Sequence, residues 1–183
     1  MTSQNNLSSY GSIKPYNTYN SRAGSLQIDR IIHELKIILV GDVAVGKTAM
    51  FNRFVDNTYT DEYASNIGVA FKVKMLYLNE NTGAELKIWD TCGSEKFQSL
   101  TRQYYHDTHG AIILFELTEK KTFLSIQNWY NDIKENGPNG TTIFLVGNKS
   151  DLVDSRAVSF EEAEKFAKSN NFKIFRSICQ NRR

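Results

Sequence analysis

Hydrophobic residues along this chain follow two patterns, continuous blocks and strict alternation. The blocks at residues 37–40 (IILV), 111–115 (AIILF) and 143–146 (IFLV) are short and uninterrupted, which is typical of strands that helices cover on both faces. At residues 69–78 (VAFKVKMLYL) apolar and polar positions alternate, and a second run follows at 86–89 (LKIW) after a turn-forming segment. This arrangement predicts an antiparallel hairpin at a sheet edge.

Apolar residues at helical spacing predict helices in the second half of the chain. Phe123, Ile126, Tyr130 and Ile133 recur at intervals of three or four residues. The Ser-x-x-Glu pattern that begins at Ser159 resembles a capping box, which marks the start of a helix. We therefore predict an α/β fold with a mostly parallel sheet, one antiparallel edge hairpin and helices on both faces.

The first part of the chain has a different composition. Residues 1–33 are rich in Ser, Asn and Tyr and show no sustained helix-type or strand-type periodicity, which predicts a disordered extension before a folded domain at 34–183. Residues 26–33 could instead continue into the first strand or a short helix. Residues 1–33 could be a solvated extension without a partner, or a tail that docks onto another molecule.

Composition limits the class of protein only broadly. A chain of 183 residues, 40% hydrophobic and with a formal net charge of +2, suits one domain and gives no reason to expect nucleic acid as a partner. No apolar run approaches the roughly 18 residues of a membrane helix, and residues 1–10 do not resemble a signal peptide. We expect a cytoplasmic protein in which Cys92 and Cys179 are reduced thiols.

The strongest chemical signal is a glycine loop that directly follows the first strand. Residues 41–48 (GDVAVGKT) match G-x-x-x-x-G-K-[ST], in which backbone N–H groups surround phosphates, the lysine adds a positive charge and the hydroxyl can bind Mg²⁺. The expected phosphate-binding residues are Gly41, Asp42, Val43, Ala44, Val45, Gly46, Lys47 and Thr48. This loop alone does not decide whether the protein is an ATPase, a kinase or a GTPase.

Two later segments narrow the ligand to a guanine nucleotide. Asn148, Lys149 and Asp151 follow an apolar strand, and the Asp151 carboxylate can accept hydrogen bonds from guanine N1–H and its 2-amino group. Adenine offers neither donor on that edge. After the hairpin, Asp90 can hold Mg²⁺ through its water shell and Gly93 can present an N–H group to a γ-phosphate.

At this point the chain resembles the Rab family of Ras-superfamily small GTPases. The resemblance rests on residues 56–65 (DNTYTDEYAS), 67–72 (IGVAFK) and 87–105 (KIWDTCGSEKFQSLTRQYY), and it covers residues 34 to about 177. It implies a P-loop NTPase G domain that binds GTP and GDP with Mg²⁺ and works in vesicle trafficking. The first and last of these segments correspond to the two switch regions.

The same resemblance assigns several contact residues. Tyr59 would pack across the guanine edge, and Phe71, Trp89 and Tyr104 would form an aromatic surface for effector or regulator proteins. Ordinary core and hairpin packing is the alternative explanation for these aromatic residues. Such a protein would reach endomembranes peripherally, through its partners.

Several departures from the family pattern fall on catalysis. Ser94 stands where the family has a glutamine that orients the attacking water, and its hydroxyl is too short for that task, so no catalytic residue is assigned. Val43 would hinder an arginine finger. Ala44 would cost about 1 kcal/mol if the loop requires a positive φ. Asn66 replaces a Mg²⁺-binding threonine, which makes it a doubtful ligand and weakens the GTP-bound switch more than GDP binding.

The end of the chain also differs from the family pattern. Residues 178–180 (ICQ) align with a Ser-Ala-Lys element that contacts guanine, and the sequence predicts that the last helix and the prenylated cysteine tail are missing, with no lipid anchor evident. Apolar surface left uncovered by that helix would favour a partner, a dimer or poor solubility.

Three hypotheses follow from these observations. The chain is a slow Rab-like switch, a guanine-nucleotide-binding module that does not cycle, or a truncated and nonfunctional copy of a Rab protein.

Overall fold

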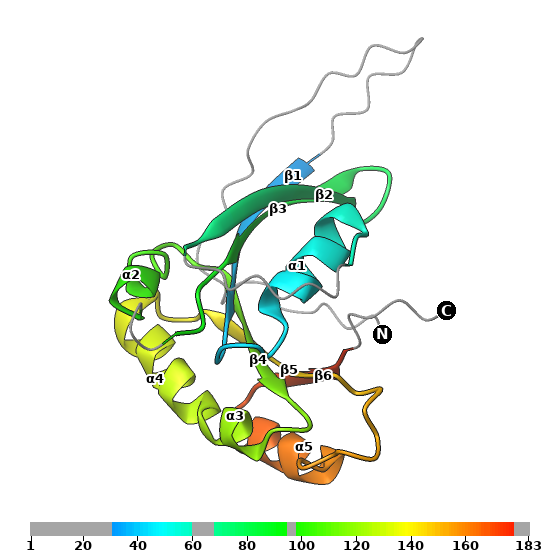
Figure 1. The fold of residues 1–183 in the computed structure, drawn as a ribbon. Coiled ribbons are helices and arrows are strands. Elements are labelled where there is room, and N and C mark those ends of the chain that lie inside the picture. Colours follow the sequence, from blue (N-terminus) through cyan, green and yellow to red (C-terminus); the bar gives the residue numbers. More distant parts are fainter. Residues whose placement is uncertain (1–30, 60–67, 95–97, 178–183) are drawn as a thin grey trace, which may run out of the picture.

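The computed structural model describes residues 31–59, 68–94 and 98–177, which form a six-stranded sheet with helices on both faces (Figure 1). The strands are β1 (Ile31–Val40), β2 (Ala70–Tyr77), β3 (Thr82–Asp90), β4 (Gly110–Glu116), β5 (Thr142–Asn148) and β6 (Lys173–Arg176). The helices within these ranges are α1 (Lys47–Asp56), α2 (Gln98–Arg102), α3 (Lys120–Leu124), α4 (Ile126–Asn136) and α5 (Phe160–Ser169).

The sheet has the topology that the apolar patterns predict. Its strand order is β2-β3-β1-β4-β5-β6, and every neighbouring pair is parallel except β2 and β3. The antiparallel register of that pair places Phe71 opposite Trp89 and Tyr77 opposite Gly83 at the edge of the sheet. The predicted α/β class and the edge hairpin are therefore confirmed.

Strand β1 is longer than the apolar block at 37–40 predicts. It begins at Ile31, three residues before the expected domain boundary at Glu34, and pairs with β3 along its length. Ile32 is only 5% exposed, and a Cβ added at Gly83 would lie 2.8 Å from its Cδ1 atom. Because Gly83 has no side chain, there is room for Ile32 beside it. Burial of Ile32 there lets β1 begin ahead of the polar residues at 33, 34 and 36.

The predicted helices form, with one difference in their boundaries. The spacing from Phe123 to Ile133 falls on two successive helices, α3 and α4, which meet at Ser125. At the start of α5 the Ser159 hydroxyl accepts a hydrogen bond from the Glu162 N–H group at 3.1 Å, as a capping box requires. The Glu162 carboxylate pairs with Lys120, which ties α5 to α3.

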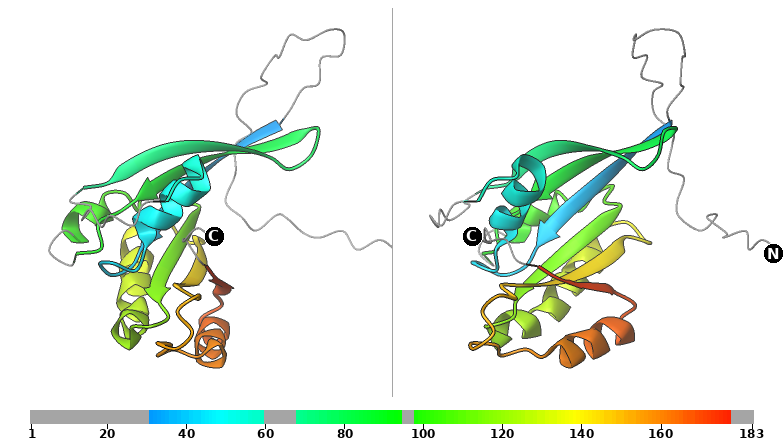
Figure 2. Two further views of the ribbon diagram at one scale, coloured as in Figure 1. Left: turned by 45° about the vertical axis from the view of Figure 1, so that its right-hand side comes forward. Right: turned by 90° about the vertical axis from the view of Figure 1, so that its right-hand side faces the viewer.

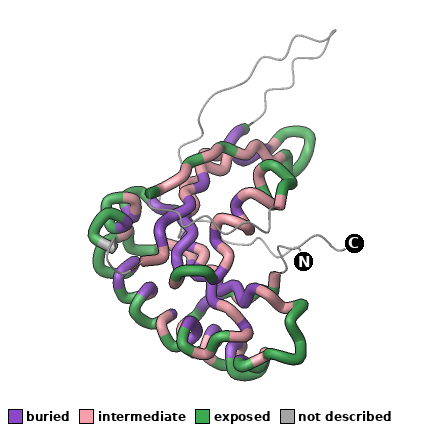
Figure 3. The backbone as a smooth tube through the Cα atoms, viewed as in Figure 1, coloured by how far each residue is buried: buried purple, intermediate pink, exposed green. Residues whose placement is uncertain are grey.

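The two faces of the sheet are covered unequally. Figures 1 and 2 show α3, α4 and α5 together on one side and α1 on the other. Toward the three helices, Ile38, Ile113 and Leu145 are fully buried in the larger of two apolar clusters. Toward α1, a smaller cluster contains Leu39 and Leu114. The buried stretches cross the middle of the molecule, while loops and outer helix surfaces are exposed (Figure 3).

Two further expectations concern the two cysteines and membrane-spanning helices. Cys92 is a buried, free thiol, whereas Cys179 lies outside the described residues. None of the helices in the three described ranges combines the length and apolarity that crossing a membrane requires.

Candidate nucleotide site

The candidate site lies where the loops after β1, β3 and β5 meet. In an open α/β sheet these carboxyl ends of parallel strands are the usual position of a ligand. The loop after β1 contains Gly41 to Gly46, the loop after β3 contains Gly93, and the loop after β5 contains Lys149. The structure therefore brings the three sequence motifs to one edge of the sheet.

The phosphate loop has a backbone shape that depends on its glycines. Gly41 and Gly46 have φ values of 136° and 95°, and a Cβ at Gly41 would lie 2.2 Å from the Leu114 carbonyl oxygen. Gly46 is the N-cap of α1 and has no side chain to satisfy the first N–H groups of the helix. These N–H groups and the helix dipole make the start of α1 suited to an anion such as phosphate.

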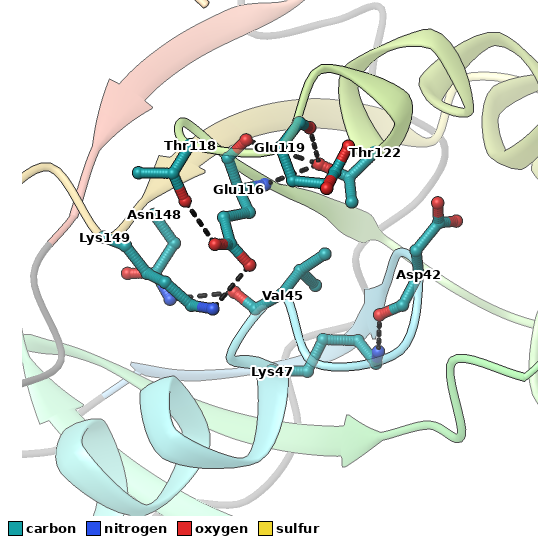
Figure 4. A network of polar contacts seen from close by, with 9 residues as sticks. All are labelled: Asp42, Val45, Lys47, Glu116, Thr118, Glu119, Thr122, Asn148 and Lys149. Carbon is teal, nitrogen blue, oxygen red and sulfur yellow. Dashed lines mark hydrogen bonds and ion pairs between the residues drawn. The ribbon is translucent and has the colours of Figure 1, made fainter. Parts of the chain in front are cut away.

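Lys47 occupies the centre of this loop. Its ammonium group is buried and donates a hydrogen bond to the Gly41 carbonyl oxygen at 2.9 Å. It donates a second to the Asp42 carbonyl oxygen at 2.7 Å (Figure 4). Burial lowers the pKa of Lys47 to about 8, although the nearby Asp90 opposes this shift. A Cβ at Gly93 would lie 2.3 Å from the Lys47 Nζ atom, so only glycine fits where the loop after β3 passes the ammonium group.

The two expected magnesium ligands are in direct contact. The Thr48 hydroxyl donates to the Asp90 carboxylate at 2.6 Å, and Asp90 is completely buried. Thr91 anchors the same segment through a 2.7 Å hydrogen bond to the Leu39 carbonyl. Within the described residues no group of three or more His, Cys, Asp or Glu side chains is placed to hold a metal. One hydroxyl and one carboxylate suit Mg²⁺, which binds proteins through few ligands together with phosphates.

The loop that the sequence predicts to bind guanine is attached to the phosphate loop by Asn148. Its side-chain amide donates to the Val45 carbonyl oxygen at 2.9 Å (Figure 4). A Cβ at Gly46 would lie 2.2 Å from the same amide nitrogen. Lys149 has a φ of 59° and turns the chain sharply at this point. Asp151 is exposed two residues later, so its carboxylate is accessible to a ligand. Asn148 thus joins the two loops that the sequence predicts to act on one nucleotide.

Three polar contacts around the site were not expected from the sequence. Lys149 forms an ion pair with Glu116 at 2.5 Å, and the Thr118 hydroxyl bonds to the same carboxylate (Figure 4). Glu116 ends strand β4, and its position after the apolar block 111–115 is the signal that could have identified it. The Trp129 indole N–H group donates to the Asp42 carboxylate at 2.7 Å. Nothing in the local sequence marks that contact, because it joins residues 87 positions apart.

A buried carboxylate on α4 contacts the end of the segment 87–105. Asp132 accepts hydrogen bonds from Arg102 of α2 at 2.7 Å and from the Tyr105 hydroxyl at 3.0 Å. Burial, together with the negative charge of Asp132, raises the pKa of Tyr105, which keeps its hydroxyl a donor. Asp132 and Trp129 lie one turn apart on α4, so this helix contacts both α2 and the phosphate loop.

Three of the positions expected to depart from the family pattern lie within the described residues. Ala44 has a φ of 66°, so the strain expected for a side chain in this conformation is present. Val43 is 45% exposed at the outside of the loop. Ser94 is half-buried directly after Gly93. Asn66 and residues 178–180 lie outside the described residues.

The aromatic residues expected to meet partners form one cluster. The Trp89 ring lies 4.6 Å from that of Phe71 and 5.0 Å from that of Tyr104, and Phe71 is 45% exposed. Tyr59 lies after α1, where the Arg53 guanidinium is 5.8 Å from the centre of its ring. The contact of Tyr59 with guanine remains a prediction.

Fold and site together have the architecture of a P-loop nucleotide-binding domain. A family model described as Ras family matches residues 36–182. The chain is 42% identical to the GTP-binding protein ypt1 of Schizosaccharomyces pombe over 136 residues, covering 74% of this chain and 66% of the relative. It is 43% identical to RabC of Dictyostelium discoideum over 134 residues, covering 72% and 68%, and 37% identical to Rab-13 of Rattus norvegicus over 148 residues, covering 81% and 72%.

The chain therefore belongs to the Ras family and, within it, to the Rab group of small GTPases. It spans about two thirds of the length of these relatives.

Proposed function

We propose that this chain binds GDP and GTP together with Mg²⁺ and acts as a Rab-type switch at the periphery of endomembranes. The observation that carries the proposal is the 2.9 Å hydrogen bond from Asn148 to the Val45 carbonyl. This bond holds a guanine-selective loop against a phosphate loop, so one ligand with both a guanine and phosphates satisfies the two motifs.

In this proposal different residues bind different parts of the nucleotide. The N–H groups of the phosphate loop and the Lys47 ammonium bind the phosphates, and Asp151 accepts hydrogen bonds from the guanine. Thr48 and Asp90 hold Mg²⁺, which neutralises phosphate charge when it is bound. Lys149 lines the base site while Glu116 fixes its side chain.

We further propose that hydrolysis is slow. Ser94 follows Gly93 at the position where a longer side chain would orient the attacking water, and the exposed Val43 stands where an arginine finger would approach. The same two residues favour the alternative that the chain binds nucleotide without cycling and presents one surface constantly. In either case the cluster of Phe71, Trp89 and Tyr104 is the surface proposed to contact effectors or regulators.

Nucleotide selectivity tests the main proposal. The nucleotide content of the purified protein, measured by mass spectrometry, should be GDP or GTP. In titrations with Mg²⁺, IDP lacks the 2-amino group and should bind about tenfold or more weakly than GDP, because one hydrogen bond to the charged Asp151 is lost. ADP should not compete. Protein that is empty and unaffected by GDP would contradict the proposal.

Two further measurements separate the alternatives. Single-turnover hydrolysis of GTP at the rate of an ordinary small GTPase would exclude the non-cycling module. A cooperative thermal transition that moves upward with added GDP would exclude the nonfunctional copy, because only a folded site can gain stability from a ligand.

A further inference from the structure

Strand β4 ends on a carboxylate at the edge of the sheet where the nucleotide is proposed to bind. β4 lies between β1 and β5, so its last residue, Glu116, stands between the phosphate loop and the loop that the sequence predicts to bind guanine. In the register of β4 and β5, Glu116 is opposite Asn148, and its side chain is only 17% exposed. A negative charge at this place opposes an anionic ligand unless a cation neutralises it.

The Glu116 carboxylate is held by contacts from two directions. One oxygen accepts a hydrogen bond from the Lys149 ammonium at 2.5 Å, and the other accepts one from the Thr118 hydroxyl (Figure 4). The Glu116 backbone N–H group donates to the Thr122 hydroxyl at 2.9 Å. That hydroxyl donates in turn to the Glu119 carbonyl oxygen at 2.8 Å. The protein therefore fixes both the backbone and the side chain of Glu116.

The same ion pair determines what Lys149 can offer to a ligand. Its ammonium group is directed at the Glu116 carboxylate, as Figure 4 shows, so its charge is neutralised within the protein. The side chain is 34% exposed, and the stem that leads to the ammonium group is an apolar surface suited to the flat face of a base. A lysine stem is long and normally mobile. Because the ion pair holds its end, ordering of the stem is not left to the binding step.

We propose that Glu116 is a positioning residue for the guanine base, an inference that rests on the proposed function. Its carboxylate is neutralised by Lys149 and holds the lysine stem as a rigid surface beside the base. Since binding does not have to immobilise this stem, the bound nucleotide dissociates more slowly. The base-selective hydrogen bonds belong to Asp151, so Glu116 sets how long the nucleotide stays and does not select the base.

Dissociation of GDP from the full chain in the presence of Mg²⁺ tests this role. Glu116→Gln keeps the shape of the side chain but loses the charge that holds Lys149, so GDP should dissociate about tenfold faster. Its association rate should change less than about twofold. Dissociation of IDP should accelerate by the same factor, because the 2-amino group of guanine is not involved. Unequal factors would assign Glu116 to base selection and overturn the inference.

Two further variants control for general effects of the substitution. Glu162→Gln also removes a glutamate that pairs with a lysine, Lys120, but this pair joins α3 to α5. GDP should dissociate from it as from the unaltered chain, and equal acceleration in both glutamine variants would contradict a specific role of Glu116. Thr118→Val is a milder change, which removes only the hydroxyl contact with Glu116. It should accelerate GDP dissociation about two- to threefold.

A double-mutant cycle separates positioning from general packing. Lys149→Met keeps an apolar side chain but leaves the Glu116 carboxylate without its cation, so GDP should again dissociate about tenfold faster. If Glu116 acts through Lys149, the double variant should dissociate GDP at a rate close to that of either single variant. Additive effects, about 100-fold in total, would show that Glu116 acts independently and would refute the inference.

A measurement without nucleotide distinguishes this inference from the proposed function. Carbon-13 relaxation should show a rigid Lys149 Cε atom in the unaltered chain and a mobile one in Glu116→Gln. A mobile Cε in the unaltered chain would refute the positioning role even if GDP binds. Failure of the unaltered chain to bind GDP would contradict the proposed function, whereas normal binding with unchanged dissociation in Glu116→Gln would overturn this inference alone.

Discussion

Two parts of the nucleotide site differ in how they are held. In the first part, Gly46, Lys47 and Asn148 are fixed by hydrogen bonds and close contacts among the loops after β1 and β5. In the second part, Val43 and Ser94 are partly exposed beside the region where a γ-phosphate would react. The first part has the residue types of its family, and the second does not.

This difference separates the requirements of binding from those of hydrolysis. Binding needs N–H groups, a cation and a base-selective carboxylate at defined positions, and the glycines of the loops tolerate little change because neighbouring atoms fill the space beside them. Hydrolysis needs one more group that orients water, and that group can be lost without moving the rest. We therefore expect substitutions in the first part to affect affinity and stability, and substitutions in the second to affect the rate.

The largest effect is expected for Gly46→Ala. Its Cβ would lie 2.2 Å from the Asn148 amide and must displace the contact between the two loops, so GDP affinity should fall more than about 100-fold in titrations. Gly140→Ala is a matched control, because Gly140 has the same φ of 95° with nothing within 4 Å of the added Cβ. This control carries only the backbone strain, on the order of 1 kcal/mol, and should bind GDP normally.

Equal loss of GDP affinity in these two variants would contradict the interlocked arrangement of the loops. It would mean that general destabilisation, and not the contact between Gly46 and Asn148, decides binding.

The next largest effect is expected in the second part of the site, where a substitution should change the rate of GTP hydrolysis alone. Ser94→Gln supplies a side chain long enough to reach a water beside the γ-phosphate, so single-turnover hydrolysis should rise about tenfold or more. GDP affinity should stay within about twofold, since Ser94 is not placed among the binding contacts. Ser94→Ala is the control and should hydrolyse as slowly as the unaltered chain. If glutamine leaves the rate unchanged, the limit lies at another residue, with Val43 the first to test.

A smaller effect is expected for Trp129→Phe. The substitution removes the indole N–H group that donates to Asp42 at 2.7 Å while keeping an aromatic ring on α4. Because Asp42 is half-buried and water can replace part of the bond, the loss should be about 1 kcal/mol of unfolding free energy, with GDP dissociating a few-fold faster. A double-mutant cycle with Asp42→Ala measures the coupling. Additive effects would show that Trp129 does not position the loop.

Most of the fold could be predicted because its signals are local. The blocks 37–40, 111–115 and 143–146 became β1, β4 and β5, and the alternation at 69–78 became the edge strand β2. Residues 26–33 were compatible with a continuation of the first strand or with a short helix, and β1 does begin at Ile31. The local sequence could not decide between these alternatives, since the burial of Ile32 depends on the missing side chain of Gly83 on another strand. Pairing partners across the sheet are not visible in a single stretch of sequence.

The candidate site shows the same division between local and distant signals. Lys47, Thr48 and Asp90 lie together because each motif directly follows a strand, and the carboxyl ends of parallel strands share one edge. The contact between Trp129 and Asp42 joins two elements through a side chain whose helical spacing explains its burial equally well. Core packing and a site contact have the same pattern in the sequence, and only the structure distinguishes them.

The smallest effect tests whether Ala44, another departure from the family pattern, carries a cost. Ala44 has a φ of 66°, where an L side chain costs on the order of 1 kcal/mol that glycine does not, so Ala44→Gly should relieve strain. Glycine also gains entropy in the unfolded chain, which offsets part of this, and a rise of about 0.5 kcal/mol in unfolding free energy is expected. Ala157→Gly, at an exposed position without a positive φ, carries only the entropic loss and should be destabilised in chemical denaturation. Equal destabilisation of both variants would mean that the phosphate loop accommodates Ala44 without strain.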